Sequence, residues 1–340
     1  MKLRRGHRIA LFAGGGLGGL AATSAAALVG LIWGEIKLAH RRIPKAQEDP
    51  PAHDDTIWTA AGVSGARPPI RIAMLGDSTA AGYGVFRDRD TPGAQLAIGI
   101  SEAARRPVHI TNVAVVGAES NEVPQQLEQL RGKRLDLAVI IVGANDVTSR
   151  TKPPVAVAYL EDVVRRLHAM GAEVVVGTCP DLGTIRPLAQ PLRAYARRLS
   201  RGMAREQTVA VVRAGGRTVS LGDLCGPMFM SRLDLFSDDR FHPSAAGYAE
   251  AARAMLPSCL HALGLRTRAR SASAFTTRRV KTAKRAAAQA VAHPGSEVVG
   301  AERFGRAEGR HGPFARLRRR LPRRPQARSP EEAVPVSTSS

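Results

Sequence analysis

The sequence contains few cysteines, and their spacing excludes two kinds of small, cross-linked fold. The 340 residues include three, Cys179, Cys225 and Cys259, and no two of them have the paired spacing of a zinc site. Three cysteines also cannot build the disulfide framework of a small secreted domain. Two states are open: one disulfide with a free thiol outside the cell, or three reduced and buried thiols. No internal repeat is visible, so a repeat architecture is not indicated.

Residues 9–33 contain no charged side chain. This run is longer than the roughly 7–15 residues of a signal-peptide core and the about 20 residues that span a bilayer. We therefore expect residues 1–39 to form a basic segment and a transmembrane signal anchor, with a cleaved signal peptide as the alternative. Lys and Arg are equally frequent on both sides of the run, so the positive-inside rule assigns no orientation. The short basic stretch before it favours export, with the main domain outside the cytoplasm, or a secreted protein if the segment is cleaved.

Negative charge is scarce in the last quarter of the chain. Residues 266–328 carry 18 Lys and Arg but only 3 Asp and Glu, which is most of the net charge of +21. Rich in Ala, Arg, Pro and Ser, residues 265–340 are expected to form a basic, largely disordered tail. Nucleic acid is not the favoured partner, because a bias toward Arg codons explains the composition; an anionic lipid or envelope surface is preferred. Residues 40–68 are polar and Pro-rich and are expected to be a linker.

The middle of the chain alternates strand and helix patterns. Five apolar runs of strand length lie at residues 70–75, 108–116, 135–143, 172–178 and 208–214. Continuous Val- and Ile-rich runs suit strands buried on both faces of a parallel sheet, and helical patterns lie between them. Ser120 or Asn121 is the expected cap of the helix after the second run, and Ser244 that of the last helix. Residues 69–264 are thus predicted to be one doubly wound α/β domain.

Three turns follow the first three strands and meet at the carboxyl edge of such a sheet, where ligands bind. They are "GDST" at 76–79, "GAES" at 117–120 and "GAND" at 143–146. Ser78 can supply a hydroxyl nucleophile, which needs a base and an orienting group. The backbone N–H of Gly117 and the side-chain amide of Asn145 can donate to a developing oxyanion. His242 is the candidate base, and Asp239, three residues earlier, can orient its ring.

Each of these residues also has an ordinary structural interpretation. A Ser after a strand is usually a helix cap, and an Asn there is usually a turn residue. Asp77 is expected to bind backbone amides in its own turn, and Asp146 to brace the loops. Asp238 is a rival to Asp239 as the orienting carboxylate. The catalytic interpretation therefore rests on all the residues occurring together, in order, at strand ends.

In that order, the residues resemble the GDSL/SGNH hydrolase family. The matching blocks are Gly76-Asp77-Ser78, then Gly117, then Gly143-Ala144-Asn145-Asp146, then Asp239-Arg240-Phe241-His242. Thr79 stands where the family name has Leu, at a position that varies within the family. The resemblance covers about residues 70–263, and the G-x-S-x-G elbow of α/β-hydrolases does not occur in the sequence.

The resemblance implies a flavodoxin-like three-layer α/β/α sandwich with a five-stranded parallel sheet. It implies a serine esterase or lipase that cleaves carboxylic esters, with Ser78 as nucleophile, His242 as base and Asp239 as its orienting group. The oxyanion hole would consist of Ser78, Gly117 and Asn145. Supporting positions are Asp77, Gly143 and Asp146. No metal ion or other cofactor is implied.

Other functions remain open at this level. The same site could act as an acyltransferase or acetyl-glycan esterase on envelope sugars or lipids, so the substrate is a small-molecule, lipid or glycan ester. A different class is a membrane-tethered binding protein that uses its basic tail. Met228, Phe229 and Met230 are candidates for the wall of an acyl pocket, with core packing as the equal alternative.

Overall fold

The computed structural model describes residues 49–51, 55–222, 229, 232–265, 275–277, 280–293, 295–301 and 313–320. The expected anchor at residues 9–33 lies outside these ranges, as do Cys225, Met228 and Met230. Cys179 and Cys259 are both buried. Within the described ranges, no helix has the length and apolar character needed to span a membrane.

Five parallel strands form the centre of the sheet and confirm the expected fold class. They are β2 (Ile70–Gly76), β3 (Val108–Asn112), β4 (Leu137–Ile141), β5 (Glu173–Gly177) and β6 (Arg217–Val219). Their spatial order is β3-β2-β4-β5-β6, which is the flavodoxin-like order. All five strands are parallel, but the chain adds β3 on one side of β2 and the later strands on the other, so the strand order switches between β2 and β4, beside the turns expected to carry the site.

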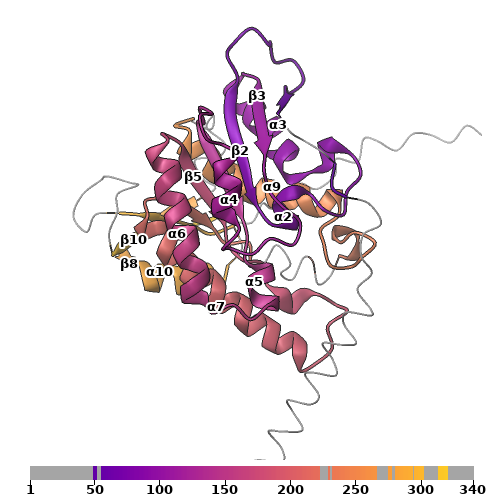
Figure 1. The fold of residues 1–340 in the computed structure, drawn as a ribbon, viewed down its shortest axis with the longest axis vertical. Coiled ribbons are helices and arrows are strands. Elements are labelled where there is room, and N and C mark those ends of the chain that lie inside the picture. The colour runs from indigo at the N-terminus through magenta and orange to yellow at the C-terminus, as the bar shows by residue number, and fades with distance from the viewer. Residues whose placement is uncertain are drawn as a thin grey trace, which may run out of the picture.

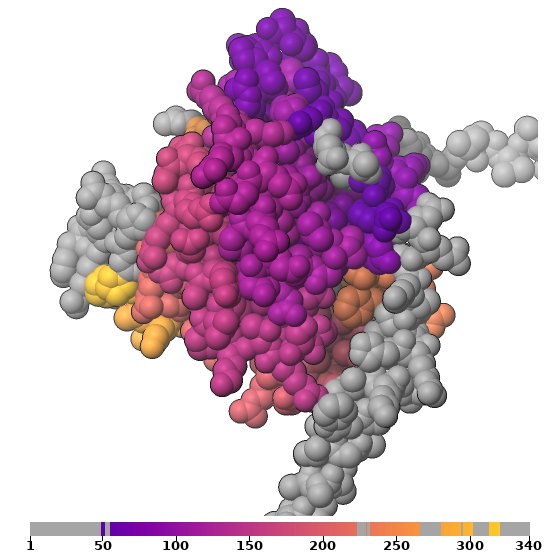
Figure 2. All heavy atoms as spheres, viewed as in Figure 1, coloured from indigo at the N-terminus to yellow at the C-terminus, as the bar shows by residue number. Residues whose placement is uncertain are grey.

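Helices cover both faces of this sheet and complete three layers (Figure 1). One face packs against α3 (Pro92–Ala104) and α9 (Ala245–Ala262). The other packs against α4 (Val123–Glu128), α6 (Pro153–Ala169) and α7 (Leu192–Arg213). In the space-filling view the side chains of α4 and α6 close over this second face (Figure 2). Shorter turns are α2 (Ser78–Ala81), η1 (Asp88–Asp90), α5 (Ala144–Thr148), η2 (Leu182–Thr184) and η3 (Leu233–Leu235).

Strand β4 shows why the layers form. Leu137 and Val139 belong to the same apolar cluster as Leu96 of α3 and Met255 of α9. Ile140 points the opposite way, into the cluster that contains α6. Alternate residues of a strand face opposite sides, so an unbroken apolar run buries both faces at once.

The fifth predicted strand is wrong. Residues 208–214 form the last turns of α7, and the fifth parallel strand is β6. The apolar run is helical because it is buried on two sides: Val211 packs in the core of the parallel sheet, and Val212 packs in a separate cluster with Ala286. A short Val-rich run fits a doubly buried helix as well as a strand.

Two segments of the expected domain division contain regular structure among the described residues. Strand β1 (Thr56–Trp58), inside the expected linker at 40–68, pairs antiparallel with β3. The expected disordered tail at 265–340 contains an ordered unit that we call the added edge, made of the described residues from 275 to 320. Its elements are β7 (Phe275–Thr277), β8 (Lys281–Thr282), α10 (Ala283–Ala290), β9 (Glu297–Gly300) and β10 (Phe314–Arg320).

The added edge continues the sheet beyond β6. Strand β9 pairs antiparallel with β6, and β10 pairs antiparallel with β9. Between these strands and α7 lies a small core in which Ala283 and Ala290 of α10 meet Leu317 and Val212. The orange and yellow atoms of this unit lie at the lower left in Figure 2. Its apolar residues are few and mostly Ala, and they lie among many arginines, so the sequence shows no clear strand or helix periodicity there.

Candidate active site

Ser78 begins α2 directly after β2. The strand ends at Gly76, whose φ is +131° and where a Cβ atom would lie 1.8 Å from the carbonyl oxygen of Ile141. Asp77 is the N-cap of α2, because its Oδ1 accepts a hydrogen bond of 2.9 Å from the backbone N–H of Thr79. The capping role that Ser78 could have filled therefore belongs to Asp77, and the Ser78 hydroxyl is left for another partner.

That partner is His242. Ser78 Oγ lies 2.9 Å from Nε2 of His242, and Nδ1 of the same ring lies 2.6 Å from Oδ2 of Asp239. Asp239 Oδ1 accepts from the backbone N–H groups of Phe241 and His242 and from the hydroxyl of Ser237. With Nδ1–H donating to the carboxylate, Nε2 is the acceptor for the Ser78 hydroxyl. Three residues from two distant segments thus form one hydrogen-bonded series.

The carboxylate of Asp239 is held in its ionised form. Burial alone raises its pKa, but hydrogen bonds from His242 and Ser237 outweigh burial and lower the pKa to about 2. A permanent negative charge next to Nδ1 stabilises an imidazolium when the ring accepts a proton. The neighbouring Asp238 is exposed to solvent, so the rival assignment is not supported by its position.

The turns after β3 and β4 lie against each other. Asn145 Nδ2 in α5 donates to the carbonyl of Ala118 at 3.0 Å, next to Gly117. Gly117 has φ +86°, and no heavy atom lies within 4 Å of the position of a Cβ. Buried Asp146 accepts from the backbone N–H and hydroxyl of Ser120, which braces the same two turns. Ser120 therefore does not cap α4, whose N-cap is Glu122; Asn121 is not the cap either.

The remaining predicted residues have structural surroundings. A Cβ on Gly143 would lie 2.6 Å from Nε2 of Gln207, so this glycine lets α5 approach α7. Asp77 is buried below α2, and burial raises its pKa to about 6. Phe229 is fully buried and packs edge-to-face against Phe236, so core packing, and not a pocket wall, describes it. Ser244 caps α9 as expected, accepting from the N–H of Gly247.

The sequence reasoning missed several neighbours of the site. Gln126 of α4 forms two 2.8 Å hydrogen bonds with the backbone of Gly76 and fixes the end of β2. The ring of His242 contacts the rings of both Tyr83 and Phe241, with centroid distances of 4.7 and 4.8 Å and edge-to-face geometry. Tyr83 and Phe241 adjoin the two motifs in sequence, and that adjacency was the only available signal.

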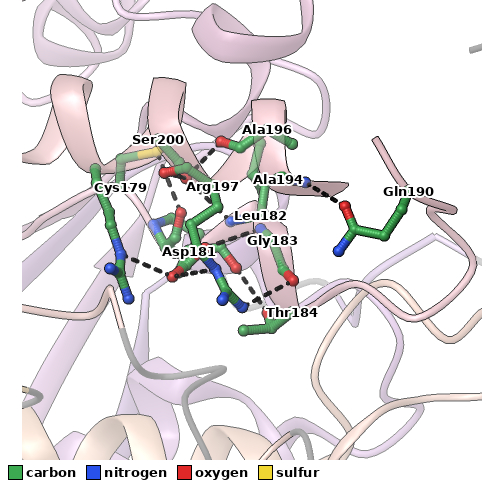
Figure 3. Close-up of polar contacts among 12 residues, drawn as sticks. Cys179, Asp181, Leu182, Gly183, Thr184, Gln190, Ala194, Ala196, Arg197 and Ser200 are labelled. Carbon is green, nitrogen blue, oxygen red and sulfur yellow. Dashed lines mark hydrogen bonds and ion pairs between the residues drawn. The ribbon is translucent and has the colours of Figure 1, made fainter. Parts of the chain in front are cut away.

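The loop after β5 also lies at the carboxyl edge of the parallel sheet, beside the turn after β4. Buried Asp181 accepts from the N–H of Gly183 and forms ion pairs with Nε of Arg197 and Arg201 at 3.3 and 3.0 Å, which holds η2 against α7 (Figure 3). Leu182 packs in the apolar cluster of α5, against which Phe241 also packs. Among the described residues, no cluster of three His, Cys, Asp or Glu could hold a metal ion.

A hydroxyl, an imidazole and a carboxylate in hydrogen-bonded series at the carboxyl edge of a parallel sheet make up the arrangement of a serine hydrolase. The chain belongs to the GDSL-like lipase/acylhydrolase family, whose model matches residues 74–250. It is therefore a carboxylic ester hydrolase.

One named relative is consistent with this class, and the chain is also similar to two solved structures. A GDSL-like esterase of Mycobacterium tuberculosis, Rv1075c, is 42% identical over 246 residues, which are 69% of this chain and 78% of the relative. A structure of the acetylxylan esterase Axe2 from Geobacillus stearothermophilus has a TM-score of 0.46 at 16% identity, covering 61% of this chain and 100% of that one. The esterase EstA from Pseudoalteromonas has a TM-score of 0.45 at 17% identity, covering 56% and 96%.

Proposed function

We propose that the protein hydrolyses carboxylic esters through an acyl-enzyme on Ser78. The observation that carries the proposal is the series from Ser78 Oγ to His242 and on to Asp239, with distances of 2.9 and 2.6 Å. A serine hydroxyl is a weak nucleophile unless an adjacent base takes its proton as it attacks. In this series the base is at hydrogen-bonding distance and its second nitrogen is fixed by an ionised carboxylate.

In the first step, Ser78 Oγ bonds to the carbonyl carbon of the ester while its proton passes to Nε2 of His242. The carbonyl oxygen becomes an oxyanion, for which the donors are the N–H groups of Ser78 and Gly117 and the amide of Asn145. One hydrogen of that amide is engaged by the Ala118 carbonyl, and the second is left for the oxyanion. His242 then gives its proton to the ester oxygen, and the alcohol leaves.

In the second step, water attacks the acyl-enzyme while His242 accepts a proton from it. The new tetrahedral intermediate collapses, the bond to Ser78 Oγ breaks, and His242 returns the proton to that oxygen. A carboxylic acid and the free enzyme result. An alcohol or sugar hydroxyl that replaces water would instead give acyl transfer, so the two reactions differ only in the acceptor.

The test is the release of p-nitrophenol from p-nitrophenyl esters of graded acyl length. Ser78→Ala is expected to abolish the burst, and Asn145→Ala to lower the rate by about 10²–10³ while remaining folded. Asp239→Asn should lower kcat by about 10⁴, because the wrong tautomer of His242 is then favoured. Asp238→Asn is the matched control and should leave kcat unchanged. A normal burst in Ser78→Ala would exclude the mechanism.

A second experiment distinguishes a hydrolase from a transferase. Alcohols or acetyl acceptors are added, and the partition of the acyl group between water and the added acceptor is measured.

We also propose that residues 9–33 attach the protein to a membrane, with the catalytic domain outside the cytoplasm. The support is the length of this uncharged run and the basic residues on both sides of it. Extraction of membranes with alkaline carbonate should leave the protein in the membrane fraction. A C-terminal reporter active only outside the cytoplasm should be active. Release into the soluble fraction at full length, or a cytoplasmic signal, would contradict the proposal.

A further inference from the structure

Tyr83 touches both the proposed nucleophile and the proposed base. Its backbone N–H donates to the carbonyl of Ser78 at 2.9 Å, so its main chain is fixed to the residue that carries the nucleophile. Its ring meets the imidazole of His242 at a centroid distance of 4.7 Å and an angle of 73°. One residue thus spans the two segments whose separation sets the Oγ–Nε2 distance.

The backbone around Tyr83 is shaped for this contact. Gly82 and Gly84, on either side, have φ values of +86° and +95°, a region that L side chains rarely adopt. A Cβ on Gly84 would lie 3.2 Å from Cβ of His242 and 2.9 Å from the hydroxyl oxygen of Ser237. The glycines therefore let the main chain lie directly against the segment that carries His242.

A second tyrosine fixes Tyr83 from the opposite side. Tyr248 of α9 is fully buried, and its hydroxyl donates to the carbonyl of Tyr83 at 2.8 Å. Burial, together with the carboxylates of Asp77 and Asp239, raises the pKa of Tyr248 well above its usual value, so the hydroxyl keeps its proton and remains a donor. Helix α9, which carries Tyr248, has its N-cap at Ser244, two residues after His242 in the sequence.

We propose that Tyr83 and Tyr248 are positioning residues, which together hold His242 at hydrogen-bonding distance from Ser78. The inference rests on the proposed function of that pair. The hydroxyl of Tyr248 fixes the main chain of Tyr83, and the ring of Tyr83, in edge-to-face contact with the imidazole, limits its rotation. Proton transfer depends steeply on this geometry, because a displacement of about 1 Å can cost about 10²-fold in rate.

The expected effect is on kcat, with KM retained, because neither tyrosine is proposed to bind the ester. Tyr248→Phe removes only the hydroxyl. It should lower kcat by about tenfold, because a small displacement of His242 relative to Ser78 slows proton transfer. Tyr83→Leu removes the ring but keeps both backbone hydrogen bonds, and it should lower kcat by about 10²-fold. Tyr83→Phe restores a ring at the same place and should recover most of kcat.

The sequence provides matched controls. Its four tyrosines include Tyr159 and Tyr195, which are 41% and 40% exposed. Tyr159→Phe and Tyr195→Phe should behave as the wild type. The full-length protein and all variants are assayed with p-nitrophenyl acetate, and labelling of Ser78 by a fluorophosphonate gives a second measure of nucleophile activation that does not depend on deacylation. If Tyr248→Phe does not fold, as judged by thermal unfolding, Tyr83→Leu and Tyr83→Phe still decide the matter.

Lowered kcat and slower labelling in Tyr248→Phe and Tyr83→Leu, with KM retained and recovery in Tyr83→Phe, would support the inference. Wild-type kcat in Tyr83→Leu, a loss confined to KM, or no recovery in Tyr83→Phe would overturn it. The Ser78→Ala variant distinguishes failure of the positioning role from failure of the proposed function. If Ser78→Ala abolishes the burst while the tyrosine variants match the wild type, only the positioning role fails; if Ser78→Ala keeps the burst, the proposed function fails first.

Discussion

The parallel strands and the added edge each bury a carboxylate, and they hold it in different ways. Asp77, at the end of β2, is 1% exposed; its Oδ1 binds the N–H of Thr79, and its Oδ2 has no hydrogen-bond partner among the described residues. Glu297 of β9 is fully buried, and its Oε2 also has no hydrogen-bond partner among the described residues, but the carboxylate forms ion pairs: Oε1 lies 3.1 Å from Nη1 of Arg217 and Oε2 lies 3.7 Å from Nη1 of Arg318. Glu297 is thus compensated by two guanidinium groups, whereas Asp77 has no Arg or Lys partner and depends mainly on hydrogen bonding to Thr79.

The difference follows from what each carboxylate organises. Asp77 is the N-cap of α2, the helix that begins with Ser78. Its position is therefore set by the geometry of the site, although burial disfavours its charged form. Glu297 joins three adjacent strands, because Arg217 lies on β6 and Arg318 is directly opposite Glu297 on β10. Removing one partner of such a pair leaves an uncompensated buried charge, which the Ala-rich core around it cannot offset.

Breaking the compensated pair should have the largest effect on stability. Glu297→Gln leaves two buried guanidinium groups without their carboxylate and should lower the free energy of unfolding by about 3–5 kcal/mol, measured by urea denaturation. Glu161→Gln, which breaks a surface pair with Arg165 on α6, is the control and should cost at most about 0.5 kcal/mol. Equal losses in the two variants would show that Glu297 does not secure the added edge.

Asp77 should make the free energy of unfolding depend on pH. The pKa of Asp77 is raised from 3.8 to about 6, so the folded state holds the proton more tightly than the unfolded state does. Stability contributed in this way is present below pH 4 and is lost as the pH rises to about 6, by up to roughly 3 kcal/mol. Asn caps a helix as well as Asp does, but does not titrate.

Asp77→Asn should therefore become more stable relative to the wild type as the pH rises from 4 to 6. Urea unfolding at several pH values measures this difference, and Asp238→Asn, an exposed neighbour of the site, should show none. Parallel stability curves for Asp77→Asn and the wild type would mean that the buried carboxyl does not titrate in this window.

Helix caps provide the smallest and best-matched comparison. Ser244 caps α9 next to the site, and Thr282 caps α10 in the added edge. Replacing either by Ala should cost about 1 kcal/mol of stability, measured by thermal unfolding. Only Ser244→Ala should also lower kcat for p-nitrophenyl acetate, because α9 begins directly beyond His242. A loss of kcat in Thr282→Ala would show that the two regions are coupled more closely than the contacts indicate.

The sequence predicted what depends on neighbouring residues and missed what depends on distant ones. The first four parallel strands were found because each is an unbroken apolar run, and the candidate residues because each follows a strand or lies in a short motif. Tyr248 could not be found, since its partner Tyr83 is 165 positions away and nothing in a local pattern marks the pair. The added edge was missed because its buried Ala and Leu are few and lie among arginines.

Helix α7 makes these two regions one unit of folding. Val211 contributes to the core of the parallel sheet, and the adjacent Val212 contributes to the core under α10, so neither core is complete without the same helix. The added edge therefore cannot open while α7 keeps its full set of contacts, and unfolding should be cooperative across both regions. A fragment that ends with α9, close to the end of the family match at residue 250, would expose Val212 and the unpaired edge of β6. The folded unit therefore includes β10, which lies well past residue 250, where the family match ends.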